Sequence, residues 1–284
     1  MKYPEPVEGL CKLRKYGARR PSWYSRHMTI RNGIITLILA VLIGIAGWYI
    51  YSNSQSLPHV LTESGDRQQK EETDYYTVQV VYPNATRLAT RTDSSKAADE
   101  RAVSTIEREL QDVVQAFKSA ANAALTADEK ERLAAAKLKY SLNVAYRGYN
   151  SGSFVSEEFD IFQDTGGAHP INFYKTLVFD LKGNKVSLDG IFVSGSNYLE
   201  RISTEATKQV GQQLTQKGAG ANATTSLVAE GVAPKAENFT NFVVNDGVLT
   251  FFIPPYQAAS YAAGSFEVRI PLLDMKDIVK PGIQ

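Results

Sequence analysis

Two neighbouring stretches decide the fold: LKYSLNVAYRGYN at 138–150 and SFVSEEFDIFQD at 153–164. In each of them apolar and polar side chains alternate, which is the two-residue period of a β-strand. Asn150, Ser151 and Gly152 lie between the two stretches and favour a tight turn. Together the two stretches therefore predict an antiparallel hairpin.

More strands are predicted on both sides of this hairpin. Upstream, YYTVQVVYP at 75–83 alternates and ends at a proline. Downstream, NFYKTLVFDL at 172–181 and KVSLDGIF at 185–192 predict a second hairpin, in which Gly183 and Asn184 supply positive-φ positions. Two or three further strands are predicted from the apolar stretches at 239–246, 248–256 and 265–275, with a turn at 245–247.

Three helices are predicted, the first and third from apolar residues at three- to four-residue spacing. The first begins after a cap at Asp93 or Ser94, the second is a short helix that begins at Thr126, and the third begins at Ser196. Residues 217–238 are rich in Gly, Ala and Ser and are predicted to form a surface loop. The predicted fold class is therefore α+β, a mostly antiparallel sheet with two or three helices packed on it.

The stretch GIITLILAVLIGIAGWYIY at 33–51 has nineteen uncharged and mostly large apolar residues. This length is close to what a helix needs to cross the hydrocarbon core of a bilayer. Arg26 and Arg31 precede the stretch, so the positive-inside rule places the N-terminus in the cytoplasm. We therefore predict one transmembrane helix before the α+β domain; a cleaved signal peptide is the alternative.

The predicted domain organisation has four parts. They are a short basic cytoplasmic tail at 1–31, the transmembrane anchor at 32–52, a flexible tether at 53–74 and an extracytoplasmic α+β binding domain at 75–284. A further hypothesis is that translation starts at Met28, which leaves residues 1–27 untranslated.

Charge is unevenly distributed along the chain. Residues 1–31 hold eight Lys or Arg against two Glu, and the rest of the chain holds the other 23 basic and 28 acidic side chains, a net of about −5. An acidic outer part disfavours nucleic acid and favours a cationic partner. Cys11 is the only cysteine, so an intrachain disulfide is excluded, and no cofactor motif is found.

Catalytic residues are not predicted. The three histidines, His27, His59 and His169, are too dispersed for a catalytic triad or a metal site. Glu158 and Asp160 share one face of an alternating strand, which we interpret as a solvated sheet surface. A hydrolase that relies on these two carboxylates is the alternative.

The turn DTGGAHPIN at 164–172 interrupts the regular strand region. Gly166 and Gly167 are predicted to supply positive φ, while His169 bonds a neighbouring backbone group; the alternative is that exposed amides and the imidazole contact a ligand. The aromatic residues near 256–266 similarly predict either core and edge packing or a carbohydrate platform. The candidate ligand-binding residues are therefore Gly166, Gly167, His169, Tyr256 and Tyr261.

Three stretches together resemble a known family: TGGAHP at 165–170, NFYKTLVFDLKGNKVSLDGIF at 172–192 and VLTFFIPPYQAASYAAGSFEVRIPLLDM at 248–275. From Tyr75 to Ile278 the chain is similar to the extracellular domain shared by the lysozyme-responsive anti-sigma factor RsiV and the N-terminal region of the peptidoglycan deacetylase PdaC. The resemblance implies an α+β envelope domain, anchored by one helix, that binds at the cell wall, where the partners of its relatives include lysozyme. The chain departs from both relatives, because neither a folded cytoplasmic segment nor a deacetylase domain with its Asp and His metal ligands is expected.

The expected function is that of a membrane-anchored extracytoplasmic binding or sensing module of the bacterial cell envelope. Its expected partners are the membrane and either a cell-wall component or a cationic, wall-directed protein such as a lysozyme, but no nucleic acid. We expect no enzyme activity, no cofactor and no metal. A carboxylate-dependent cell-wall hydrolase and a structural partner of a membrane complex are the alternatives.

Overall fold

The computed structural model describes residues 66–86, 95–218 and 226–283. The chain divides into two units, 1–59 and 60–284, and all of the described residues lie in the second unit. No helix among the described residues has both the length and the apolar character to cross a membrane. The predicted anchor at 32–52 lies outside the described residues, as does the predicted helix cap at 93–94.

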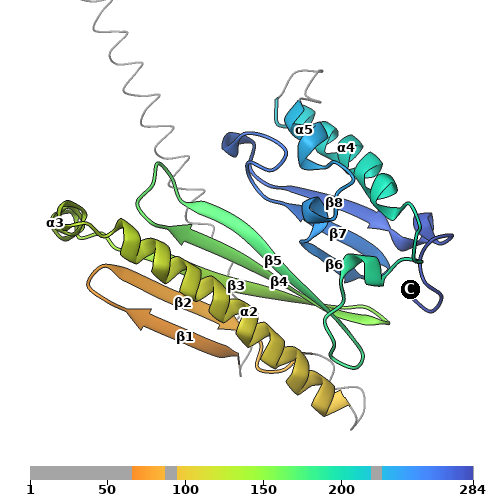
Figure 1. Ribbon diagram of the computed structural model, residues 1–284, viewed down its shortest axis with the longest axis horizontal. Coiled ribbons are helices and arrows are strands. Elements are labelled where there is room, and N and C mark those ends of the chain that lie inside the picture. Colours follow the sequence, from red (N-terminus) through yellow and green to blue (C-terminus); the bar gives the residue numbers. More distant parts are fainter. Residues whose placement is uncertain (1–65, 87–94, 219–225, 284) are drawn as a thin grey trace, which may run out of the picture. The chain divides into compact units, whose positions relative to one another are not determined.

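A five-stranded sheet forms the first half of the described part, with the strand order β1-β2-β3-β4-β5 (Figure 1). Its strands are β1 (Arg67–Glu72), β2 (Tyr76–Tyr82), β3 (Tyr140–Asn150), β4 (Phe154–Asp164) and β5 (Ile171–Asp180). Neighbouring strands pair antiparallel except β2 and β3, which are parallel. Helices α2 (Ser95–Ala124) and α3 (Ala127–Ala136) form the long connection that a parallel pair requires.

Helix α2 lies across one face of this sheet (Figure 1). Ile106, Val114 and Phe117 recur on one side of the helix, are completely buried, and belong to the same core as Phe159 of β4. Burial of large apolar side chains at this spacing fixes the helix on the sheet. The structure thus confirms the first two predicted helices and the β3–β4 hairpin.

A three-stranded antiparallel sheet follows, with the strand order β6-β7-β8. Its strands are β6 (Phe242–Asn245), β7 (Val248–Ile253) and β8 (Phe266–Pro271), and helices α4 (Tyr198–Gln216) and α5 (Ser226–Gly231) pack beside it. Asp246 and Gly247 have φ angles of 47° and 72° and form the predicted turn between β6 and β7. Short 3-10 turns complete the described part, at Leu188–Gly190, Ala236–Phe239, Tyr261–Ala263 and Leu272–Met275.

The outer edge of β6 contacts the face of the first sheet that is opposite to α2. The hydroxyl of Thr176 on β5 accepts a hydrogen bond from the N–H of Phe242 at 2.8 Å. On β4, the hydroxyl of Ser156 accepts from the N–H of Val244 at 3.1 Å and donates to the carbonyl of Val244 at 3.3 Å. Two hydroxyls therefore supply to β6 the hydrogen bonds that a neighbouring strand would otherwise make.

Two predictions about the sheet are corrected. The α+β class with antiparallel-rich pairing is confirmed, but the strands form two sheets, not one. Residues 185–192, predicted as a strand, form a 3-10 turn at Leu188–Gly190 between two isolated bridges, one from Lys185 to Phe179 and one from Phe192 to Val279. The physical reason is that Leu188 and Ile191 both turn into the core beneath the second sheet, which an alternating strand does not allow.

Two segments predicted to lack regular structure are ordered. Strand β1 lies inside the predicted tether at 53–74, so the folded part starts before the predicted residue Tyr75. Its sequence RQQKEE has no apolar alternation, so the pattern does not indicate a strand. The strand is held instead by backbone pairing with β2 and by ion pairs such as that of Lys118 with Glu71. Within the predicted loop at 217–238, helix α5 forms because Val228 is completely buried.

Candidate functional site

Three of the candidate residues form an aromatic cluster, which consists of His169, Tyr256 and Tyr261. His169 lies in the turn between β4 and β5, and the two tyrosines lie in the connection between β7 and β8. The His169 ring stacks on Tyr261, with centroids 3.7 Å apart and planes inclined by 15°. The ring of Tyr256 lies 5.9 Å from His169 and 5.5 Å from Tyr261. The fold therefore joins two segments that are far apart in the sequence.

Hydrogen bonds fix the orientation of this aromatic cluster. His169 Nδ1 lies 3.1 Å from the carbonyl oxygen of Pro170, which also accepts a bond from the Tyr261 hydroxyl at 2.9 Å. Because a carbonyl only accepts, a neutral imidazole carries its proton on Nδ1, and Nε2 accepts from the Tyr256 hydroxyl at 2.7 Å. The predicted bond from His169 to a neighbouring backbone group is confirmed.

Tyr256 is the exposed member of the aromatic cluster. Its side chain is 58% exposed, although the hydroxyl is held by His169. Its φ of 71° lies in the left-handed region, which is unfavourable for a bulky residue. Such strain is maintained only where the surroundings impose it, and it is concentrated at functional sites. The Tyr256 ring is therefore exposed to solvent while its hydroxyl is bonded to His169.

The two candidate glycines lie beside the aromatic cluster and serve the turn. Gly166 has a φ of 76°, as predicted, and a Cβ there would lie 2.7 Å from the ring of Tyr140. Its N–H donates to the carboxylate of Asp164 at 2.9 Å. Gly167 does not have a positive φ, so the prediction for this residue is wrong. Gly166 therefore supplies the positive φ of the turn, and its close approach to Tyr140 favours a glycine there.

Of the two carboxylates predicted to be solvated, Glu158 is buried and Asp160 is half-buried. Glu158 is only 2% exposed, because β6 and its sheet cover the face of β4 on which it lies. It accepts a hydrogen bond from the Tyr149 hydroxyl and lies 3.5 Å from the guanidinium of Arg147. Burial raises the pKa of Glu158, against the lowering effects of Tyr149 and Arg147. Burial also raises the pKa of Asp160.

A small polar cavity of about 180 Å³ lies next to these carboxylates. Arg147 and Tyr149 line it from the first sheet, and Thr250, Phe252 and Glu267 are among the residues that line it from the second sheet. Burial, followed by the hydrogen bond to Glu158, raises the pKa of Tyr149 to about 12, so this hydroxyl keeps its proton and donates. The site is thus a buried network of charged and polar groups between two sheets.

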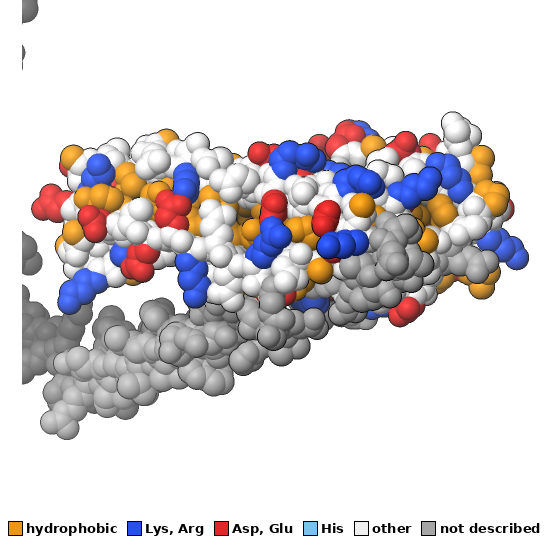
Figure 2. Space-filling model, turned by 90° about the horizontal axis from the view of Figure 1, so that it is seen from below, with side chains coloured by type: hydrophobic (Ala, Val, Ile, Leu, Met, Phe, Trp, Pro, Cys, Tyr) orange, Lys and Arg blue, Asp and Glu red, His pale blue; other side chains and the backbone are white. Residues whose placement is uncertain are grey.

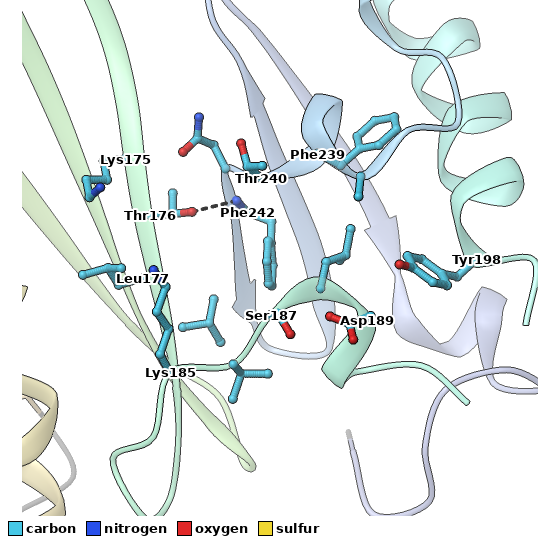
Figure 3. Close-up of a pocket in the computed structure, with 15 residues that line it drawn as sticks. Lys175, Thr176, Leu177, Lys185, Ser187, Asp189, Tyr198, Phe239, Thr240 and Phe242 are labelled. Atoms are coloured by element: carbon cyan, nitrogen blue, oxygen red, sulfur yellow. Dashed lines mark hydrogen bonds between the residues drawn. The ribbon is translucent and has the colours of Figure 1, made fainter. Parts of the chain in front are cut away.

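A larger pocket of about 460 Å³ opens beside β5 (Figure 3). Val178, Leu188, Phe239 and Phe242 contribute apolar side chains to its wall. Polar groups of Ser187, Asp189 and Tyr198 lie around it, from the segment after β5 and the start of α4 (Figure 3). Sequence reasoning did not find this pocket, because its wall combines segments that show no shared motif.

Metal ligands do not gather anywhere in the part of the chain that the structure describes. Within residues 66–86, 95–218 and 226–283, no group of three or more His, Cys, Asp or Glu side chains is placed to hold a metal ion. The two ring nitrogens of His169 instead face the Pro170 carbonyl and the Tyr256 hydroxyl.

Comparison with known protein families gives two matches, which correspond to the two sheets. Residues 69–172 match the family described as deacetylase PdaC, and this range covers most of the first sheet with α2 and α3. Residues 189–272 match the family described as a protein of unknown function, DUF3298, and this range covers α4, α5 and the second sheet. The described part is therefore related to the PdaC and DUF3298 families. The predicted likeness to RsiV stays a prediction.

The individual relatives share only low sequence identity with the chain. The chain is 30% identical to the peptidoglycan-N-acetylmuramic acid deacetylase PdaC of Bacillus subtilis over 49% of this chain and 29% of that protein. It is 28% identical to the esterase Rv3036c of Mycobacterium tuberculosis over 39% of this chain and 45% of that protein. A crystal structure of a DUF3298 family member from Bacteroides fragilis aligns with a TM-score of 0.48 at 19% identity, over 76% of this chain and 92% of that one. The chain thus spans less than half the length of the PdaC and Rv3036c proteins.

Proposed function

We propose that this protein is a binding module of the bacterial cell envelope, anchored by residues 32–52, whose α+β domain faces outward and contacts a cell-wall fragment. The relation to PdaC supports this proposal, because the Bacillus subtilis protein is named for its action on peptidoglycan. The anchor and its orientation enter the proposal from the apolar stretch and its basic flank. The contact surface in this proposal is the aromatic cluster of His169, Tyr256 and Tyr261.

The observation that carries the proposal is the exposed and fixed ring of Tyr256. A sugar ring presents an apolar face of C–H groups, and such faces stack on aromatic side chains. A ring that is already fixed by a hydrogen bond to His169 loses little conformational freedom when a ligand binds. The Tyr261 hydroxyl and the His169 imidazole both contact the backbone carbonyl of Pro170. This arrangement suits a glycan better than a reaction, because every polar group in it is already hydrogen-bonded.

A lysozyme-like protein is the other partner considered for this surface. The outer part of the chain carries a net charge of about −5, which favours a cationic partner. On the face that Figure 2 shows, however, Lys and Arg side chains are interspersed with Asp and Glu, without a continuous acidic patch. We place the wall fragment first, because the exposed ring of Tyr256 suits the apolar face of a sugar.

The test is cosedimentation of the full chain with purified peptidoglycan sacculi. We expect Tyr256→Ala to weaken retention about threefold to tenfold, and Tyr256→Phe to keep most of it, because the ring face remains. Leu273→Ala is the matched control, since Leu273 is 73% exposed and lies at the opposite end of β7. Equal retention of Tyr256→Ala and Leu273→Ala would contradict the proposed surface. Retention of lysozyme but not of sacculi would assign the module to a protein partner instead.

A carboxylate-dependent hydrolase is the second candidate. The observation that favours it is the pair of carboxyl groups of Glu158 and Asp160 on one face of β4 beside a polar cavity; burial raises the pKa of both groups, which is the direction a general acid requires. Its test is release of soluble fragments from labelled sacculi by the full chain. Activity that is lost in Asp160→Asn would support the hydrolase, and no release by the unaltered protein would exclude it.

A further inference from the structure

The two sheets have four edges, and the structure closes three of them. An open strand edge presents unpaired N–H and C=O groups, and natural proteins cover or blunt such edges. The edge of β8 is covered by α4: Gln209 donates to the carbonyl of Arg269 at 2.8 Å and accepts from its N–H at 2.9 Å. Gln213 donates to the carbonyl of Glu267 at 2.7 Å. Two amide side chains thus act as a substitute strand.

The other two closed edges use different means. The edge of β6 is bonded by the hydroxyls of Ser156 and Thr176. The edge strand β1 consists of the polar sequence RQQKEE, in which Arg67, Glu71 and Glu72 form ion pairs. A charged edge resists pairing with another strand. The remaining edge is that of β5.

Strand β5 is open only in the middle of its outer edge. The carbonyl of Val178 accepts from the N–H of Val186 at 2.7 Å, so the backbone groups of residue 178 point away from β4. The β4–β5 register continues without a bulge, and backbone groups alternate in direction along a strand. The N–H and C=O groups of Asn172, Tyr174 and Thr176 therefore also point away from β4. At the other end, the carbonyl of Pro170 is bonded by the Tyr261 hydroxyl.

The three residues between these closed ends have free backbone groups on this side. Among the residues that the structure describes, none is hydrogen-bonded to the outward N–H and C=O groups of Asn172, Tyr174 or Thr176. The pocket of about 460 Å³ lies beside this edge, with Thr176 and Val178 in its wall (Figure 3). There is consequently both an unsatisfied strand edge and space next to it.

The side chains around this edge differ on its two faces. On the α2 face, Lys175 and Lys185 each lie 2.7 Å from one carboxylate, Glu109, so two positive charges meet one negative charge. Their side chains are 28% and 50% exposed, which leaves one of them available to another acidic group. On the opposite face, Phe239 and Phe242 contribute an apolar wall to the pocket.

From this geometry we infer that an extended segment of a partner protein pairs with β5 at residues 172–176 as an additional strand. The segment runs antiparallel to β5, so that its residues opposite Asn172, Tyr174 and Thr176 exchange N–H and C=O bonds with them. Opposite Thr176 it carries a large apolar residue that enters the pocket, and the residue that follows, opposite Lys175, is acidic. Cross-strand neighbours share a face, so the apolar wall selects the apolar residue and the excess charge at Lys175 and Lys185 selects the acidic one. This inference concerns a site different from the aromatic cluster and does not depend on the proposed wall ligand.

The test uses a labelled heptapeptide, Thr-Leu-Glu-Val-Thr-Val-Thr, and the full chain in fluorescence polarisation; in antiparallel pairing its leucine lies opposite Thr176, its glutamate opposite Lys175 and its second valine opposite Asn172. We expect saturable binding that is weakened at least tenfold when the leucine and every second residue from it are N-methylated, because these amides face β5. N-methylation of the alternate set, which includes the glutamate, is the matched control and leaves binding within about threefold. Equal effects of the two sets, or no binding at millimolar peptide, would overturn the inference.

Two protein readouts distinguish strand pairing from a nonspecific contact. Lys175→Gln is expected to weaken binding about two- to fivefold, while Lys182→Gln, in the turn beyond the paired end of β5, leaves it unchanged. Bound peptide slows hydrogen exchange at the amides of Asn172, Tyr174 and Thr176. Tyr256→Ala leaves peptide binding unaltered, so failure here and failure of the sacculus experiment are separate results.

Discussion

Replacement of Ser156 by alanine tests whether side-chain hydroxyls join the two sheets. The Ser156 hydroxyl is completely buried and serves both backbone groups of Val244, at 3.1 Å and 3.3 Å. Alanine leaves one buried N–H and one buried C=O without a partner. Each such group costs on the order of 1–3 kcal/mol. Both bonds are long, so we expect the free energy of unfolding to fall by about 2–4 kcal/mol in total.

The assay is urea denaturation of the full chain, followed by circular dichroism. Thr204→Ala is the matched control, because its hydroxyl bonds the Glu200 carbonyl on the exposed side of α4 and its loss changes stability by less than about 0.5 kcal/mol. A double variant with Thr176→Val is expected to lose less than the sum of the two single losses, since both hydroxyls hold the same strand. A Ser156→Ala protein as stable as Thr204→Ala would refute the reasoning.

Three further predictions follow from the fold. Gly183→Ala places a Cβ 1.9 Å from the Ala98 carbonyl oxygen at a φ of 75°, and we expect it to lower the free energy of unfolding, measured by thermal denaturation, by about 2–4 kcal/mol. Gly195→Ala is the control: its φ is 76° but nothing lies within 4 Å, so we expect a loss of about 1 kcal/mol. Hydrogen bonds from Lys175 and Lys185 lower the pKa of Glu109 from 4.5 to about 2, so the ionised Glu109 stabilises the folded state. This contribution is fully present above pH 4.5 and is lost as pH falls toward 2, so we expect acid titration to lower the free energy of unfolding by about 1–2 kcal/mol. In Glu109→Gln this pH-dependent loss is expected to be absent. Gln209→Leu uncovers the β8 edge at Arg269 and is expected to increase oligomer formation in size-exclusion chromatography; an unchanged elution profile would contradict the covering role of α4.

The elements that depend on local pattern were predictable from the sequence. Alternation in 138–150 and 153–164 gave the β3–β4 hairpin, and Thr126 accepts a bond from the Glu129 N–H at 3.2 Å as the cap of α3. The turn at Asp246 and Gly247 also follows from its residues alone. In each case the relevant contacts lie within a few residues of one another.

Features that depend on contacts between distant segments were not predictable. Glu158 was interpreted as solvated because its strand alternates, yet β6, more than eighty residues later, covers it. His169 and Tyr256 lie in separate segments of the sequence, and only the fold brings His169 Nε2 to 2.7 Å from the Tyr256 hydroxyl. The open edge of β5 depends on strand order, which no local pattern in 171–180 encodes.

The most direct test of the account is NMR titration of the full chain with a soluble disaccharide–peptide fragment of peptidoglycan, observed at the ring protons of Tyr256 and Tyr261. The account predicts saturable shifts of both rings and of His169, with no shift at Leu273. Shifts confined to other residues, or no shift at saturating fragment, would contradict the claim that this aromatic cluster binds the cell wall.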